Sequence, residues 1–276
     1  MNDQELHSIL CQYFETDEGN HVSAMNAITP EMEGLRLFDA PLLAVADAND
    51  PMFRALQSDD VLHRDYPLPE FWLPGAKRVI SVFFPFPVSI NKTNLRDPEK
   101  PSPEWLHARF EGHDFVIKTE KMLCELLKSM GYQAVCPTLD ERFMRFNPFL
   151  PNWSERHTAF IAGLGTFGMS RGLITERGTA GRLGSVITDC PTLEVTPRPY
   201  TDIYEYCTRC GMCAKKCPPH AIDPEKAMND AKDSTICKPY MLSTKTEPQG
   251  KCGRQRYACG KCQTGVPCEH RNPTRR

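Results

Sequence analysis

The chain has 276 residues, of which 40% are hydrophobic and 25% charged, and its formal net charge is −2. This composition is typical of a globular protein with one large or two smaller domains and excludes wholesale disorder. The longest apolar stretch, residues 79–90, is interrupted by prolines and falls short of the ~20 residues that cross a bilayer. The N-terminus lacks the basic start and apolar core of a secretory signal. We therefore expect a cytoplasmic protein without a membrane span.

Helices and strands are expected to interleave in the first part of the chain. Residues 2–15 predict a short helix, and residues 78–86 predict a strand rich in valine and phenylalanine. Ser102 as N-cap, followed by Pro103, opens a much longer helix whose apolar stripe keeps helical spacing as far as Gly131.

Two further strands, at residues 133–136 and 184–188, flank a helix over residues 153–161 that has Asn152 as its expected cap. This order predicts an α/β or α+β domain over residues 1–195. Prolines then mark a boundary, and residues 196–276 predict a second domain of short, turn-rich pieces. Such pieces bury little core, so something other than burial must hold them together.

The distribution of the 13 cysteines is the most unusual feature of the sequence. Residues 1–206 contain four, which we interpret as buried small hydrophobes, whereas residues 207–268 contain nine. An odd number in a chain without an export signal argues for metal or redox chemistry. Residues 207–276 carry a formal charge of +8 and the rest −10, which suits anionic clusters and an acidic electron donor. The four early cysteines are Cys11, Cys124, Cys136 and Cys190.

The first block of cysteines has the spacing of a bacterial ferredoxin. Cys207, Cys210, Cys213 and Cys217, followed by Pro218, fit C-x2-C-x2-C-x3-C-P at every position. In that motif three thiolates bind one cubane and the fourth binds a second one. A zinc site is the alternative, because paired C-x2-C also binds zinc. Four cysteines this close that end in Cys-Pro favour two [4Fe-4S] clusters.

Two clusters require four more ligands, and five cysteines follow the first block. The pair Cys259 and Cys262 is a natural choice, and Cys252 is left over in our preferred assignment. Cys252 in place of Cys237 stays open as an alternative. The predicted ligands are Cys207, Cys210, Cys213 and Cys268 for the first cluster, and Cys217, Cys237, Cys259 and Cys262 for the second.

A glycine-rich segment, residues 162–168, contains G-x-G-x-x-G. A dinucleotide-binding fingerprint needs a strand before the glycines and a helix after them. Here a helix is expected before the glycines and a poor helix after them, so we do not expect a nucleotide site. We interpret the segment as a backbone-lined concavity, where missing side chains let a large flat ligand approach closely.

Residues 154–189, the first cysteine block, and residues 257–268 resemble, in this order, the epoxyqueuosine reductases and, more distantly, the cobalamin-dependent reductive dehalogenases. The resemblance covers roughly residues 30–272. It implies a nitroreductase-like domain that carries cobalamin, followed by a double-cubane ferredoxin-like module whose ligands include Cys237. The implied corrin contacts are Gly163, Gly165, Thr166, Phe167, Gly168, Ser170, Arg171, Gly172, Leu173, Ile174, Thr175, Gly181, Arg182 and Gly184.

The resemblance implies a cobalamin-dependent reductase in which two clusters pass electrons to cobalt and then to a small-molecule substrate. A low-potential ferredoxin or flavodoxin would be the donor, in a reducing, anaerobic cytoplasm. Phe149 stands where the family has its acidic proton donor. Other candidates flank the glycine segment: Asp140, Glu141, Glu155 and His157 for proton transfer, and Arg142 for an anionic substrate.

Two other functions are weighed against this one. The chain could be a double-cubane electron-transfer protein that reduces a partner, for example a corrinoid protein. It could also be an epoxyqueuosine reductase that acts on tRNA, but a pI near 6.5 disfavours a nucleic-acid partner.

Overall fold

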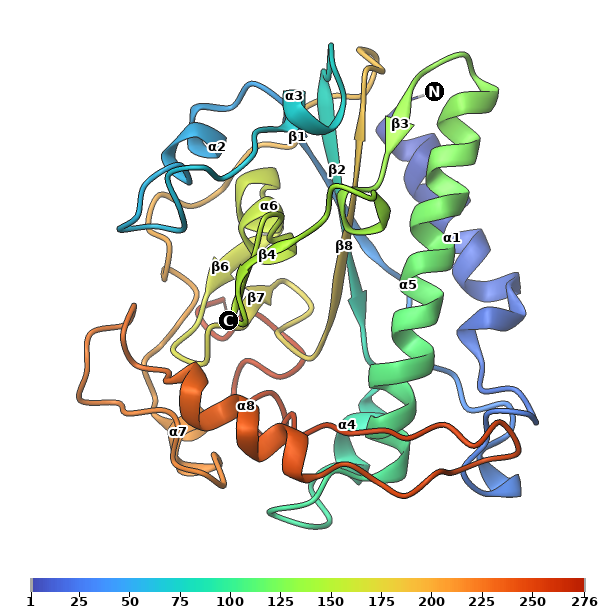
Figure 1. The fold of residues 1–276 in the computed structure, drawn as a ribbon, viewed down its shortest axis with the longest axis vertical. Coiled ribbons are helices and arrows are strands. Elements are labelled where there is room, and N and C mark those ends of the chain that lie inside the picture. Colours follow the sequence, from blue (N-terminus) through green and yellow to red (C-terminus); the bar gives the residue numbers. More distant parts are fainter. Residues whose placement is uncertain (1, 276) are drawn as a thin grey trace.

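The computed structural model describes residues 2–275 and is organised around a four-stranded sheet (Figure 1). The strand order is β1-β2-β8-β3, and all three neighbouring pairs are antiparallel. The strands are β1 (Leu42–Asp47), β2 (Arg78–Pro85), β8 (Gly181–Thr188) and β3 (Ala134–Val135). Of the two architectures expected for this region, the antiparallel pairing favours α+β, because α/β folds have mainly parallel sheets.

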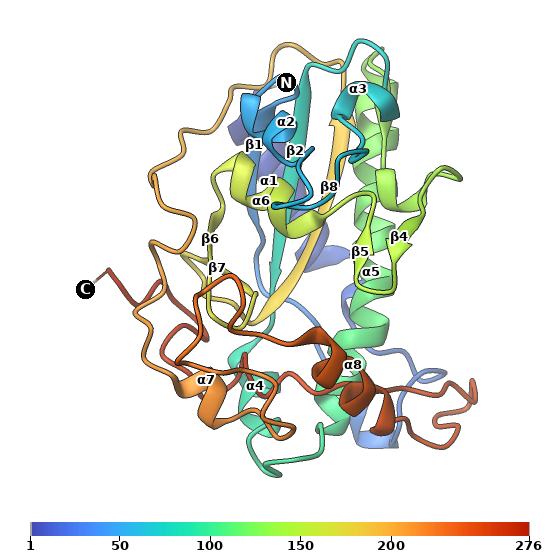
Figure 2. The same cartoon turned by 60° about the vertical axis from the view of Figure 1, so that its left-hand side comes forward.

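Two helices cover one face of the sheet, as Figures 1 and 2 show. They are α1 (Asp3–Thr16) and α5 (Pro103–Ser129). The Ser102 hydroxyl accepts a hydrogen bond from the Trp105 amide at the start of α5, and α5 ends just before Gly131, which has a φ of +88°. Both predicted helices are confirmed, and their ends follow from capping chemistry.

The central strand β2 is buried on both faces. Ile80, Val82 and Phe84 point into the core formed with α1 and α5. The alternate residues Val79 and Phe83 belong to a second core on the opposite face, as expected from the two-residue repeat of a strand. Two apolar layers therefore enclose one sheet.

The opposite face is covered by α6 (Glu155–Ala162) together with the short helices α2 (Pro51–Ala55) and α3 (Pro69–Trp72) (Figure 2). The N-cap of α6 is Ser154, so the expectation of Asn152 as cap is wrong. The Asn152 side chain instead accepts from the Met144 amide and donates to the Arg142 carbonyl. These two hydrogen bonds hold together the ends of the chain reversal over residues 142–152, which precedes α6.

Two short hairpins complete this side of the molecule. One pairs β4 (Arg145–Asn147) with β5 (Leu150–Pro151), and the other pairs β6 (Gly165–Phe167) with β7 (Leu173–Thr175). The glycine-rich segment therefore contains the first strand of a hairpin and is not the start of a helix.

The C-terminal segment runs beneath the sheet, where Figure 1 shows α7 (Met212–Lys215), α8 (Ser234–Ser243) and the neighbouring α4 (Val88–Thr93). Its buried apolar cluster is small. Three 3-10 turns lie elsewhere: Glu18–Asn20, Pro30–Met32 and Pro137–Leu139. Across residues 2–275, no helix combines the length and the apolar character that crossing a membrane requires.

Polar contacts fasten this segment to α4 and α5. The Lys261 ammonium donates to the carbonyls of Asn94, Asp97 and Lys100 at 2.6, 2.7 and 2.8 Å. The Arg256 guanidinium lies 2.8 Å from the Glu111 carboxylate on α5. The last part of the chain is thus held to the sheet region by buried charge as well as by packing.

Candidate iron–sulfur site

Four cysteines from distant parts of the sequence line one cavity. Cys207, Cys210 and Cys213 come from the loop before and within α7, and Cys268 comes from the end of the chain. Burial raises the pKa of Cys213 to about 11 and that of Cys268 to about 12, and each thiol feels the charge of Cys207 and Cys210. The cavity therefore contains the four thiols that we assigned to the first cluster.

The second predicted set is also gathered in space. Cys237 and Cys262 pack against the small apolar cluster that contains Cys217. Burial raises the pKa of Cys217 and Cys259, and the thiolates of Cys237 and Cys262 raise both further. The structure thus brings Cys217, Cys237, Cys259 and Cys262 to one place.

The remaining cysteine of this region lies apart. Cys252 is exposed, its amide donates to the Met25 carbonyl, and its thiol faces the Gln249 carbonyl. The thiolates that raise the pKa of both Cys217 and Cys259 are those of Cys237 and Cys262. This placement favours Cys237 over Cys252 as a ligand.

The two sets of thiols adjoin. The charge of Cys262, in the second set, is the largest electrostatic influence on Cys213, in the first, after burial. Within residues 2–275, no three Cys, His, Asp or Glu side chains are close enough to hold a single metal ion. A tetrahedral zinc site, whose ligands lie about 2.3 Å from the metal, is therefore not preformed in this part of the chain.

Two cationic side chains, Arg156 and Lys232, lie near the second set of thiols. The Arg156 side chain donates to the Arg171 carbonyl at 2.8 Å, and Lys232 donates to the Ser170 carbonyl at 3.0 Å. Burial lowers the pKa of the Arg156 guanidinium, whereas the nearby thiolates of Cys262 and Cys237 oppose this shift. Positive charge beside anionic clusters stabilises them and tunes their potential.

The glycine segment contacts the first set of thiols. Gly168, Ser170 and Ile174 line the same cavity as the four cysteines. The amide of Phe167 donates to the Ile203 carbonyl at 2.7 Å, which ties β6 to the chain that leads into Cys207. The hairpin is therefore one wall of the candidate cluster site.

The glycines do not form an open cradle for a flat ligand. At Gly165 a Cβ would overlap the Ile174 carbonyl, and at Gly181 it would overlap the Phe84 carbonyl. At Gly184 it would lie 2.6 Å from the Glu120 carboxylate. Packing within this chain explains the missing side chains, so the glycines at these three positions do not by themselves support a corrin contact. Of the residues predicted to contact cobalamin, those still in contact with solvent are Gly163, Arg171, Gly172, Gly181 and Arg182.

Two of the proposed catalytic residues form a structural contact. Arg142 pairs with Asp140 at 2.7 Å, and its guanidinium also donates to the carbonyls of Phe71 and Trp72. The Arg142 charge lies 5.6 Å from the Trp72 ring. These contacts use the donors of Arg142, while the adjacent Glu141 is exposed. We therefore assign Asp140 and Arg142 to the packing of α3.

The first turn of α6 contains the other two candidates. Burial raises the pKa of Glu155 to about 7 and lowers that of His157 to about 4. The His157 ring contacts the Ser154 hydroxyl at 2.8 Å. A carboxylate that the sequence did not single out, Glu120 on α5, accepts from the Ser185 amide at 3.1 Å. Burial and the charge of Glu155 raise the pKa of Glu120 well above its usual range.

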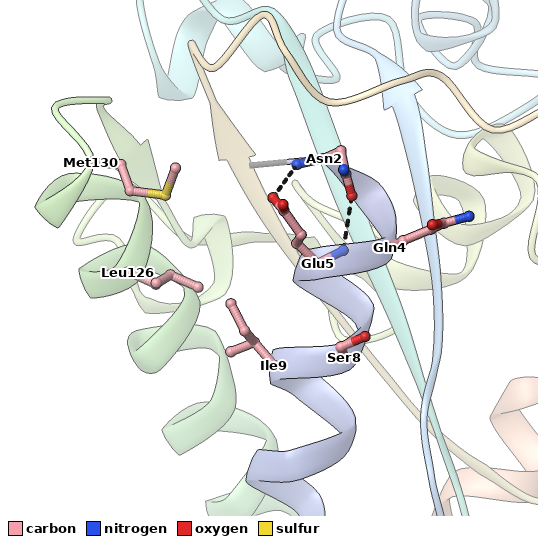
Figure 3. Close-up of a pocket in the computed structure, with 7 residues that line it drawn as sticks. All are labelled: Asn2, Gln4, Glu5, Ser8, Ile9, Leu126 and Met130. Atoms are coloured by element: carbon pink, nitrogen blue, oxygen red, sulfur yellow. Dashed lines mark hydrogen bonds between the residues drawn. The ribbon is translucent and has the colours of Figure 1, made fainter.

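A separate groove lies between α1 and the end of α5 (Figure 3). Figure 3 shows that Glu5 and Asn2 bond one another's backbone amides in a capping box at the start of α1. Ile9, Leu126 and Met130 supply an apolar wall. The residues that line the groove include none of the nine cysteines between residues 207 and 268.

Comparison with known proteins supports the iron–sulfur assignment. Residues 200–223 match the family described as the 4Fe-4S binding domain, which confirms the iron–sulfur segment predicted from the first cysteine block. Curated protein sequences provide no match.

Several solved structures share the fold at low sequence identity. An epoxyqueuosine reductase bound to a tRNA stem loop is 19% identical with a TM-score of 0.53, and the enzyme from Bacillus subtilis is 18% identical with a TM-score of 0.53. Each comparison covers 96% of this chain and 66% of the other. A reductive dehalogenase structure, described in connection with B12-dependent dehalogenation, is 17% identical with a TM-score of 0.52, over 84% of this chain and 30% of the other.

The chain thus spans just under two thirds of the length of the epoxyqueuosine reductases and about a third of that of the dehalogenase. At these identities the likeness concerns the fold. The resemblance expected from the sequence is confirmed at that level: the chain has the fold shared by epoxyqueuosine reductases and reductive dehalogenases, and it contains a 4Fe-4S binding segment.

Proposed function

We propose that the protein is an iron–sulfur reductase with two [4Fe-4S] clusters. The observation that carries this proposal is the gathering of eight cysteines into two adjoining sets of four. The first cluster would be held by Cys207, Cys210, Cys213 and Cys268, and the second by Cys217, Cys237, Cys259 and Cys262. In this proposal, residues 1–195 form a nitroreductase-like domain and residues 196–276 the cluster module.

Two clusters this close would pass electrons one at a time from a low-potential donor, such as a ferredoxin or flavodoxin. The basic C-terminal segment suits an acidic donor of this kind. Reduction of an organic substrate also consumes protons. Among the predicted candidates, Glu155 is the group that burial keeps protonated near neutral pH. We therefore propose Glu155 as the proton source. It directly precedes Arg156, whose guanidinium lies near the thiols of Cys262 and Cys237.

Cobalamin is the remaining element of the sequence-based prediction. The support for it is the fold shared with a dehalogenase described as B12-dependent. Packing within the chain accounts for Gly165, Gly181 and Gly184, so no step of the proposal depends on cobalamin. The second candidate function is an electron-transfer protein. Such a protein would use the same two clusters to reduce a partner protein, without cobalamin. A tRNA substrate is the third candidate, because one structure of this fold is bound to a tRNA stem loop.

The test begins with protein purified and reconstituted without oxygen. We expect about eight irons and eight sulfides per chain, and a decrease of about half the iron in Cys213→Ser and in Cys217→Ser. The matched control is Cys252→Ser, which should keep all its iron because Cys252 lies outside both sets. Loss of iron in Cys252→Ser, or four irons in the unmodified protein, would contradict the ligand assignment.

The same protein distinguishes the functional alternatives. Incubation with hydroxocobalamin followed by desalting should leave about one cobalt per chain if the protein is a corrinoid reductase. Eight irons without retained cobalt favour the electron-transfer protein. Salt-dependent binding of tRNA would favour the third candidate.

A further inference from the structure

Two cysteines outside the cluster sets lie in direct contact. The Sγ atoms of Cys124 and Cys136 are 3.2 Å apart. Both side chains are buried, with exposed fractions of 8% and 6%. The sequence predicts only buried small hydrophobes at these two positions, because twelve residues separate them and no motif joins them. The structure shows that they form a pair.

The arrangement of α5, the turn at Gly131 and β3 brings the two cysteines together. Cys124 lies near the end of α5, which ends at Ser129 and turns through Gly131. The chain then returns as β3, where Val135 pairs with Ile187 of β8, and Cys136 follows at once. Because α5 packs on β8, the return strand brings Cys136 against Cys124. The contact therefore belongs to the packed core and not to a mobile loop.

The two thiols differ in their affinity for a proton. The hydrogen bond from Cys136 lowers the pKa of Cys124, and the Lys128 ammonium one turn further along α5 lowers it as well. The same hydrogen bond, together with burial, raises the pKa of Cys136. One sulfur is thus the better nucleophile, and the other holds the proton of the pair.

We propose that Cys124 and Cys136 are a redox-active dithiol that closes to a disulfide when it meets a low-molecular-weight disulfide. The Cys124 thiolate attacks the small disulfide and releases one small thiol. The Cys136 sulfur then attacks the mixed disulfide at Cys124 and releases the second. The protein loses two S–H bonds and gains one S–S bond, and its two electrons and two protons pass to the two thiols released.

The geometry requires little movement. A disulfide bond is about 2.05 Å long, so the sulfurs need to approach by about 1.1 Å from their 3.2 Å separation. The other two cysteines of this region lack such a partner. Cys190 contacts the Thr192 hydroxyl at 3.3 Å, and Cys11 contacts His7. These two provide matched controls.

The experiment uses the cluster-loaded protein without oxygen. The folded protein is incubated with bis(2-hydroxyethyl) disulfide, quenched with N-ethylmaleimide in denaturant, and digested with trypsin. We expect residues 122–128 and 129–142 to be recovered as one disulfide-linked peptide pair, which dithiothreitol separates. Without the oxidant the two peptides should carry N-ethylmaleimide separately.

The variants assign the bond. The linked pair should disappear in Cys124→Ser and Cys136→Ser and persist in Cys190→Ser and Cys11→Ser. Recovery of the two wild-type peptides unlinked, at an oxidant concentration that fully modifies the exposed Cys252, would overturn the proposal. This outcome needs no variant, so it stands even if a substitution prevents folding. It is also independent of the clusters, because neither cysteine belongs to the two sets.

Discussion

At the scale of single residues, a buried charge network joins the C-terminal segment to α5. The Arg256 side chain is fully buried and lies 2.8 Å from the Glu111 carboxylate. His107 contacts the same carboxylate at 2.8 Å, and Arg254 pairs with it at 3.2 Å. A buried carboxylate of this kind is stable because several donors share it.

Removal of Arg256 tests this network. In Arg256→Met the Glu111 charge loses a fully buried, permanently charged partner, and we expect the free energy of unfolding to fall by about 3 kcal/mol. Thermal unfolding of the cluster-loaded protein measures this as a lower midpoint. The control is Arg64→Met, which breaks an exposed pair with Asp59 and should leave the midpoint nearly unchanged, because solvent screens an exposed pair. Equal effects of the two substitutions would contradict a structural role for the buried pair.

The network also predicts a pH dependence. Burial by itself would raise the pKa of Glu111, but hydrogen bonds from His107 and Arg256 outweigh it and hold the pKa below its usual value of 4.5. Ionised Glu111 therefore stabilises the fold above pH 4.5, and this contribution is lost as the pH falls through the folded-state pKa. In Glu111→Gln this part of the acid destabilisation should be missing from the thermal midpoint measured against pH. A profile unchanged from the wild type would show that Glu111 does not titrate as described.

At the scale of elements, the β6–β7 hairpin depends on a glycine for its pairing. Gly165 lies opposite Thr175, and a Cβ there would overlap the Ile174 carbonyl. The sequence predicts a helix before the G-x-G-x-x-G pattern, and the structure has α6 there, but the hairpin is not predicted. Its pairing partner lies beyond a turn, and a short apolar run does not by itself distinguish a strand from a helix.

Gly165→Ala should therefore disrupt the hairpin. Overpacking against a backbone carbonyl cannot be relieved by a rotamer change, so we expect a loss of about 3 kcal/mol and faster hydrogen exchange at Phe167. Gly34→Ala is the control, because Gly34 has open space around its Cα and a φ of +79°. Its cost should be about 1 kcal/mol, that of a left-handed residue. Unchanged exchange at Phe167 would show that the hairpin tolerates the methyl group.

At the scale of the whole molecule, the two parts of the chain differ in what stabilises them. The sheet has an extensive apolar core on each face. The region around α7 and α8 has a small cluster of its own, in which Cys217 is one member. Bound clusters would cross-link this region, since metal binding supplies folding free energy to small domains.

Removal of iron should loosen the cluster region and leave the sheet folded. After treatment with a chelator and an oxidant, we expect trypsin to cut first near Arg209, Lys215 and Lys226, while far-UV circular dichroism changes little. The segment around Arg256 should resist longer because it is bound to Glu111. Identical digestion with and without iron would contradict a structural role for the clusters.

The iron–sulfur chemistry of the site could be predicted from the sequence, because it depends on cysteines that are only a few residues apart. Four cysteines within eleven residues, from Cys207 to Cys217, form the iron–sulfur motif, and the matched segment over residues 200–223 agrees with it. The long helix α5 was equally readable, because the cap at Ser102 and the stop at Gly131 are local. Such features need no information about distant residues.

Only the tertiary structure determined which residues, distant in the sequence, are neighbours in space. It brought Cys268 to the loop of Cys210, placed Cys252 away from both sets, and put Glu120 near Glu155 across the sheet. It also joined Cys124 to Cys136 through a helix and a return strand. Each of these contacts depends on how α5, α6 and β8 pack, and packing depends on apolar surfaces that are complementary only in the folded chain. Residue types and their spacing in the sequence determined the iron–sulfur chemistry that this protein can perform. The packed core determined which side chains lie close enough to act together.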